Sequence, residues 1–226
     1  MAQQTSNLWK KLWRLKDTSI EYAFDISGIR YGSESEVSHS VESSLYDEFS
    51  IGNATTAKLT LSLYADNILF GAVIKRYARL VNGEQASEWI PKGIFFTNRR
   101  SVEDGLWNIE AYDSMRKAET IWIPDSSVSF PMLMKDVVTL FADFMDVQID
   151  PRTNLNPTYT IDNPGETCSF RQILQWIGAA HGGNWIMSDE GKLLLIPLRS
   201  IPKETNYLID DHGDAITFGG DRILVG

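Results

Sequence analysis

The chain has 226 residues, of which 43% are hydrophobic and 23% charged, and this balance excludes a mainly disordered protein. Its 21 Lys and Arg residues are outnumbered by 30 Asp and Glu residues, and the formal net charge of −9 disfavours general binding to the DNA backbone. The single cysteine, Cys168, cannot form an internal disulfide and fits synthesis in a reducing cytosol. The longest apolar run, Leu193–Leu198, is too short to span a bilayer, so no stable membrane anchoring is expected.

Residues 1–18 are predicted to contain a short amphipathic helix over 7–15, with Ser6 or Asn7 as its N-cap. We interpret this helix as one that docks on its own domain or on a neighbouring subunit rather than on a membrane. Its apolar residues recur at helical spacing, and they are Leu8, Trp9, Leu12, Trp13 and Leu15.

Residues 19–120 are predicted to form an antiparallel β-barrel domain, since short strands follow one another with no helical segment between them. Two turn signals, Asn82-Gly83 and Asp104-Gly105, are typical of tight hairpins. The Ser- and Glu-rich segment 34–50 indicates a loop or an edge hairpin rather than a central strand. Alternation of apolar and polar residues places strands near 20–26, 59–63, 70–81, 89–97 and 106–112.

After Asp113, which is expected to cap a helical turn over 114–120, the period changes. Residues 121–200 are predicted to form an inserted α+β module of two helices and a hairpin. The second helix begins at a capping box of Ser169 and Gln172 and ends at Gly182-Gly183, and a hairpin follows over 185–198. The first helix covers 133–147, with an apolar stripe of Leu133, Val137, Leu140, Phe141 and Phe144. The fold class is therefore α+β and mainly β.

No residue set in the sequence has the spacing of a catalytic or metal site, and we predict that the protein is not an enzyme and uses no cofactor. Cys168 and His181 lie at opposite ends of one predicted helix and cannot meet. His39 is expected to be exposed in the Ser-rich segment. An acidic cluster lacks the alternating ligands of a calcium loop and is interpreted as a solvated turn; it contains Asp210, Asp211, His212 and Asp214.

Aromatic residues suggest a different use of the surface. Pro91 confines the segment after Trp89 to a sheet edge or to the start of a strand, and Trp89 either packs in the core or meets a partner. Large rings are frequent at subunit contacts. The possible subunit-contact residues are Trp9, Trp13, Trp89 and Pro91.

Several short patterns occur in a fixed order along the chain. The barrel segment carries the runs Phe49–Ala54, Leu59–Leu63, Phe70–Ala72, Glu88–Phe95 and Ala111–Met115. The module matches a further pattern at Arg171, Leu174, Gly182, Gly183, Asn184, Gly191, Lys192 and Leu193. In this order the patterns resemble those of the bacteriophage and prophage tail hub proteins, over roughly residues 19–198.

The resemblance implies a virion structural protein of a phage or prophage tail, made in the bacterial host cytoplasm and placed at the baseplate or tail tip. Its copies would form a homo-oligomeric hub ring, a trimer or a hexamer, that continues the tail tube and carries the spike or tip proteins. DNA would pass through the lumen without specific binding. Hub proteins are typically longer and contain two barrels, so the strand-like pieces in 201–226 are expected to return to the first barrel or to begin a second.

One alternative remains open from the residues: a cell-wall-binding or cell-wall-degrading module of the tail tip. A binding module would stack exposed Trp rings on sugars. A degrading enzyme would need a cleft that holds a carboxylate or histidine with a displaced pKa.

Overall fold

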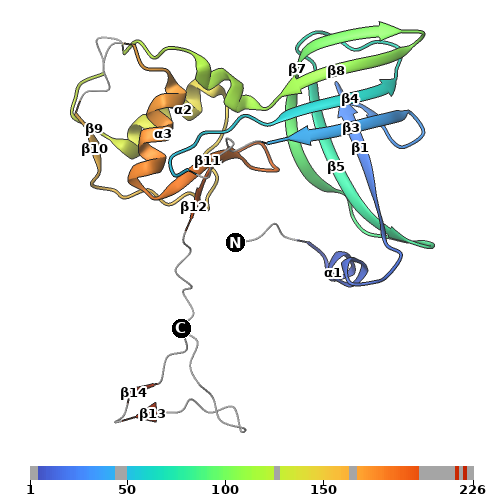
Figure 1. The fold of residues 1–226 in the computed structure, drawn as a ribbon, viewed down its shortest axis with the longest axis horizontal. Helices are drawn as coiled ribbons and strands as arrows, with labels where there is room; N and C mark the ends of the chain where they lie inside the picture. The colour runs from blue at the N-terminus through green and yellow to red at the C-terminus, as the bar shows by residue number, and fades with distance from the viewer. Residues whose placement is uncertain are drawn as a thin grey trace.

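The computed structural model describes residues 5–43, 50–124, 128–162 and 167–198, together with short strands at 217–218 and 221–222. These residues form an antiparallel sheet and, beside it, a smaller module of helices and a hairpin (Figure 1). The prediction of a mainly β protein with antiparallel sheets and a few helices is confirmed.

The main sheet has the strand order β2-β1-β5-β7-β8-β4-β3, and β6 pairs with β5 outside this path. Every neighbouring pair is antiparallel. Among the described strands, no ladder joins the end strands β2 and β3, so closure of a barrel stays a prediction. The strands are β1 (Ser19–Ile26), β2 (Ile29–Tyr31), β3 (Glu36–Glu42), β4 (Lys58–Tyr64), β5 (Val73–Asn82), β6 (Gln85–Ala86), β7 (Ile90–Glu103) and β8 (Leu106–Tyr112).

The sheet curls strongly, although its hydrogen bonds leave it open. His39 of β3 packs edge-on against Tyr22 and Phe24 of β1, with ring centroids 4.4 and 5.2 Å apart, although these strands lie near opposite ends of the strand order. The curl wraps the inner face around an apolar core. Its largest fully buried side chains are Phe24, Leu59, Leu61, Leu63, Ile68 and Ile74.

The local sequence explains these strands. Leu59, Leu61 and Leu63 alternate with polar neighbours in β4 and are all fully buried, as a period of two requires. At the β7–β8 turn, Asp104 and Gly105 have φ values of 49° and 80°, the left-handed geometry that a tight hairpin needs. The Ser- and Glu-rich segment contains β3, which lies at the end of the sheet as an edge strand.

The module has a core of its own, in which rings from several elements meet. Phe141 lies 4.5 Å from Phe170 and 5.0 Å from Trp122, both edge-on, and Trp185 is fully buried. Its elements are the 3-10 helix η1 (Ser114–Glu119), β9 (Met132–Leu133), α2 (Met134–Met145), β10 (Thr160–Ile161), α3 (Phe170–Ala180), β11 (Gly183–Met187) and β12 (Leu193–Pro197).

The two helices differ in how well the sequence pattern describes them. Helix α3 begins at the predicted capping box, in which Ser169 and Gln172 bond each other's backbone N–H groups. The stripe predicted for α2 was wrong in part, because Phe144 is 47% exposed. The buried face keeps Val137 and Phe141 of the predicted stripe but is rotated around the helix, and η1 and α3 pack against it. The residues that α2 buries are Val137, Val138, Phe141, Ala142 and Met145.

A short connecting segment, residues 50–57, joins the sheet to the module. Gly52 donates a backbone hydrogen bond to Gly183 and has a φ of +84°, and a Cβ there would lie 2.7 Å from the carbonyl oxygen of Gln175. Trp185 donates to the carbonyl of Asn53 and accepts from Thr55. Glycine is therefore required at Gly52 both for its backbone angle and for the close approach of α3.

Arg171 and Asp113 complete this connection. The Arg171 guanidinium donates to the Ala54 carbonyl at 2.7 Å and pairs with Glu119 at 3.0 Å. The buried Asp113 carboxylate caps η1 by accepting from Met115, and it also accepts from Ala57. Burial raises the pKa of Asp113 to about 7, against the opposing effect of these two N–H donors and of Arg171.

The ends of the described chain are a helix and a small hairpin. Helix α1 (Asn7–Trp13) has Ser6 as its N-cap, one of the two residues proposed for this role. The strands β13 (Thr217–Phe218) and β14 (Asp221–Arg222) pair with each other and not with the main sheet. Most of 201–226, where strand-like pieces were predicted, lies outside the described residues, so the return of this segment to a barrel stays a prediction.

Candidate functional site

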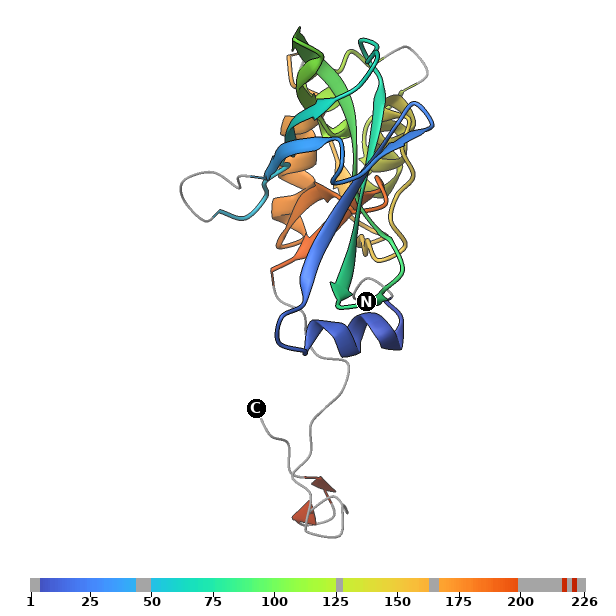
Figure 2. The ribbon, with the colours of Figure 1, turned by 90° about the vertical axis from the view of Figure 1, so that its right-hand side faces the viewer.

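Helix α1 lies across the end of the sheet where β5 turns into β6 (Figure 2). Ser6 holds its start in place, since its backbone N–H and its hydroxyl both donate to the Glu88 carboxylate, at 2.7 and 2.6 Å. Leu12 is fully buried, and Asn82 of β5 donates to the carbonyl of Lys16 just beyond the helix. The sequence-based interpretation of a helix docked on its own domain is therefore confirmed for this contact.

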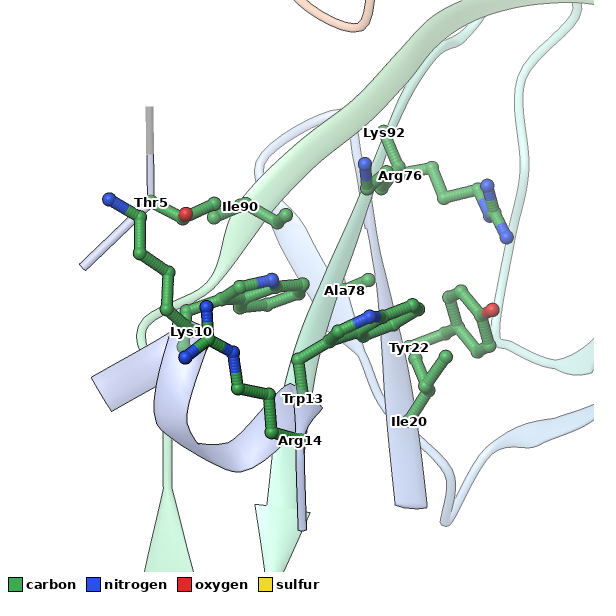
Figure 3. A pocket seen from close by; sticks show the side chains of 11 residues that line it. Thr5, Lys10, Trp13, Arg14, Ile20, Tyr22, Arg76, Ala78, Ile90 and Lys92 are labelled. Carbon is green, nitrogen blue, oxygen red and sulfur yellow. The ribbon is translucent and has the colours of Figure 1, made fainter. Parts of the chain in front are cut away.

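Between α1 and the inner face of the sheet is a groove of about 450 Å³, which we call the Trp groove (Figure 3). Trp9 and Trp13 are four residues apart and so lie on one face of the helix. In the part of the chain that the structure describes, three rings, three aliphatic side chains, four cations and one threonine line the groove, and no acidic residue does. They are Trp9, Trp13, Tyr22, Ile20, Ala78, Ile90, Lys10, Arg14, Arg76, Lys92 and Thr5.

Arg76 lies at the inner end of the Trp groove. Its guanidinium carbon lies 4.5 Å from the centre of the Tyr22 ring, and one guanidinium nitrogen is 3.2 Å from Nε2 of His39. The Nδ1 atom of His39 contacts Glu36. These partners assign the proton of a neutral His39 to Nδ1, so that Nε2 accepts from Arg76. Burial lowers the pKa of Arg76 from its ordinary value, and the Nε atom of Arg76 is buried with no hydrogen-bond partner in the described structure.

The four predicted subunit-contact residues fall into two groups. Trp9 and Trp13 line the groove together, and Trp13 is 64% exposed. Trp89 is on the opposite face of the sheet, where the guanidinium carbons of Arg79 and Arg30 lie 4.6 and 5.3 Å from its ring. Pro91 pairs in register with Tyr77 inside the β5–β7 ladder. Trp9 and Trp13 therefore lie close together, and Trp89 lies on the other face of the sheet. Contact of any of the four residues with another subunit stays a prediction.

Sequence reasoning missed most of the Trp groove. Tyr22, Arg76 and Lys92 belong to three strands that become neighbours only through sheet pairing, and no local pattern marks them. The expectation that His39 is exposed was wrong, because its side chain is 11% exposed between β3 and β1. The curl of the sheet buries the His39 side chain, and the sequence pattern does not predict this curl.

The other titratable residues considered in the sequence have structural partners. His181 ends α3, donates from Nδ1 to the Ile177 carbonyl at 2.7 Å, and accepts from the Asn156 N–H at 2.9 Å. Cys168 precedes the N-cap at the other end of the same helix. Within the described ranges, no group of three or more His, Cys, Asp or Glu side chains is placed to hold a metal. The 210–214 cluster lies outside the described residues.

A second exposed surface lies at the far end of the sheet. It is the tip of the β7–β8 hairpin, residues 102–106, which we call the hairpin tip. Val102 is 52% exposed, and Glu103 and Asp104 are exposed beside it. The adjoining loop 65–72 is attached to the hairpin, since Trp107 donates to the Ala65 carbonyl at 2.9 Å, and the loop exposes the side chain of Phe70.

None of the described helices is both long and apolar enough to cross a membrane.

No family model matches this sequence, and a comparison with curated proteins by sequence gives no match. By structure, the chain is similar to the 43 kDa tail protein of prophage MuSo2 from Shewanella oneidensis, with a TM-score of 0.53 and 13% sequence identity. The match covers 88% of this chain and 59% of that one. A tail protein from Neisseria meningitidis MC58 gives a TM-score of 0.49 at 15% identity, over 87% of this chain and 58% of that one. The chain therefore shares the fold of a prophage tail protein and spans about 59% of its length.

Proposed function

We propose that the chain is a structural, non-enzymatic subunit of a phage tail or a phage-like injection device. Its copies form the hub ring at the baseplate or tail tip, which continues the tail tube and carries the spike or tip. The observation that carries this proposal is the shared fold with the MuSo2 tail protein over 88% of the chain. Because a shared fold does not by itself define a function, the remaining support comes from the residues.

The sequence patterns that resemble hub proteins have definite structural roles in this chain. Gly52, Asp113 and Arg171 come from three separate patterns, and all three lie where the sheet meets the module. The patterns therefore describe one two-part architecture rather than three unrelated similarities. This agreement supports the hub family over a general antiparallel sheet.

The sheet also has the edges that an assembly subunit needs. Strand β2 forms one end of the sheet and β3 the other, and each pairs with a described strand on one side only. Open edges can pair with strands of neighbouring copies, and a ring satisfies the backbone groups of every copy at once. The net charge of −9 is compatible with a lumen through which DNA slides without binding.

The proposal is tested by locating the chain in an assembled particle. A small epitope tag after residue 226, labelled with gold-conjugated antibody, should appear at the distal end of the tail in electron micrographs. Label along the shaft, or particles that form normally without this chain, would contradict the hub position. Degradation of purified cell wall by the isolated protein would favour the alternative of a cell-wall-degrading module.

A further inference from the structure

The Trp groove has an unbalanced charge. Among the described residues, its lining includes Lys10, Arg14, Arg76 and Lys92 and no acidic residue, in a chain whose net charge is −9. One of these cations, Lys92, pairs with Asp189 at 3.1 Å, and a guanidinium nitrogen of Arg76 lies 3.2 Å from Nε2 of His39, whose Nδ1 contacts Glu36. Surfaces that bind each other specifically have complementary potentials, so the occupant of this groove should be acidic.

The groove also selects for shape and apolar character. Trp9, Trp13 and Tyr22 present rings to a space of about 450 Å³, a size typical of sites that enclose a ligand or a short chain segment. Burial of exposed aromatic surface is a main source of binding energy at such sites. A fitting occupant therefore combines carboxylates with an apolar side chain on a narrow projection.

The hairpin tip of the same protein has this composition. Glu103 and Asp104 lie at the turn, Val102 is half-exposed directly before them, and the exposed Phe70 is on the adjoining loop. The turn is tight, since Asp104 and Gly105 both have positive φ values. It projects from the sheet at the end opposite α1 (Figure 1).

A single strand shows that the two surfaces of one copy cannot meet. Strand β7 contributes Ile90 and Lys92 to the groove and ends at Glu103 in the tip. Its 14 residues, at about 3.3 Å each, give a length of roughly 40 Å along the bent strand, and the tip projects at the end of the sheet opposite α1 (Figure 1). The tip that fills a given groove must therefore come from a different copy.

We propose that copies of this chain associate head to tail, with the hairpin tip of one copy seated in the Trp groove of the next. Glu103 and Asp104 face Lys10 and Arg14, and Val102 packs on the Trp13 ring. This inference rests on the proposed hub function and names a side-chain contact between neighbouring copies in the ring, in addition to pairing of the open strand edges. A contact between two different surfaces repeats from copy to copy and closes when the rotation allows it.

The experiment uses two charge variants of the full chain. The groove variant is K10E/R14E, and the tip variant is E103K/D104N, where Asn replaces Asp104 because its φ of 49° suits Asn. Each variant alone should associate at least tenfold more weakly than the wild type in sedimentation equilibrium. An equimolar mixture should regain association, because each groove then finds a tip of opposite charge. The matched control is K11E/K16E, which makes the same charge change near the same helix but outside the groove lining, and it should associate as the wild type does.

A second readout traps the contact covalently. In a C168A background, K10C and E103C placed in one chain should form disulfide-linked multimers under mild oxidation, whereas either cysteine alone should not. Replacing E103C by D143C, at an exposed position on α2 of the module, provides the control pair. Equal cross-linking of both pairs, or none of the proposed pair, overturns the contact.

The failures of the two proposals are distinguishable. If the wild type forms rings and both charge variants form the same rings, the proposed contact is overturned and the hub function is not. A wild-type chain that stays monomeric at millimolar concentration and is absent from tails would overturn both. Quenching of Trp fluorescence by a polyanionic glycan, together with wild-type association of both charge variants, would assign the groove to a saccharide and contradict the docking of a second copy.

Discussion

The α+β module and the curved sheet are built around different kinds of core. In the module, rings of Trp122, Phe141 and Phe170 meet in the interior between η1, α2 and α3. In the sheet, the buried side chains are mainly aliphatic, and the inner face ends at the Trp groove, where rings and cations meet solvent. The difference teaches that aromatic residues fill the interior in one part of this chain and line a solvent-exposed groove in the other.

The largest expected effect tests the aromatic core of the module. Phe141→Ala removes a fully buried ring and should lower the free energy of unfolding by about 3–5 kcal/mol in urea denaturation. Phe144→Ala is the matched control on the same helix, since that ring is half-exposed and stacks on Phe170 at 4.3 Å, and it should cost about 1 kcal/mol. Equal losses would show that α2 does not bury the face described.

The second prediction concerns pH at the connection between sheet and module. The pKa of Asp113 in the folded chain is about 7, above its ordinary value of 3.8, so the folded state holds a proton that the unfolded state releases. Its contribution to stability is full below about pH 4 and is lost as the pH rises toward 7, by at most about 1.4 kcal/mol per pH unit.

The Asp113→Asn variant resembles the protonated side chain and keeps the N-cap. Its free energy of unfolding should lack this decline when both proteins are measured from pH 4 to 8. Parallel profiles for the two proteins would mean that the N–H donors and Arg171 keep the carboxylate ionised throughout this range.

The third prediction compares two glycines. Both Gly52→Ala and Gly71→Ala place a methyl group on a backbone with positive φ, which should cost about 1 kcal/mol in each case. At Gly52 the new Cβ would also lie 2.7 Å from the Gln175 carbonyl oxygen, whereas at Gly71 nothing lies within 4 Å. Gly52→Ala should therefore be the more destabilising by about 1–2 kcal/mol in thermal or urea unfolding. Similar values at both positions would show that the close approach of α3 relaxes easily.

The smallest expected change in stability is at Trp13. Because its ring is 64% exposed, Trp13→Ala should leave the free energy of unfolding within about 0.5 kcal/mol of the wild type. A loss above about 2 kcal/mol in the same urea titration would mean that the ring belongs to the core. The comparison between a stabilising and a binding set of aromatic residues would then fail.

Local patterns predicted much of this fold. The limits of β8 follow from its alternation between the Asp104-Gly105 turn signal and the predicted cap Asp113, and the start of α3 follows from the capping box at Ser169. Both features depend on residues within a few positions of one another. The curl that brings His39 onto Tyr22, and the face that α2 buries, depend on tertiary packing instead. For this reason the strands were predicted more accurately than their arrangement.

Only the helix residues of the candidate site could be predicted from the sequence. Trp9 and Trp13 share a helix face, and helical spacing identified them as a pair. Arg76, which follows them by more than sixty positions, enters the same groove because β5 pairs with β1. Trp89 had the same aromatic signal as the helix residues, but the alternation of the strands directs it to the opposite face, where Arg79 covers it.

Strand β7 is bent at two places, and this shape has a geometric consequence. Lys92 and Gly93 of β7 face the single residue Arg76 of β5, and Asn98 is an extra residue opposite β8. Such bulges bend a strand and increase its twist. The Trp groove and the hairpin tip lie toward opposite ends of this strand, so in the proposed head-to-tail contact its bend would set the turning angle from each copy to its neighbour. The circumference of the assembly would then depend on the two inserted residues of this strand.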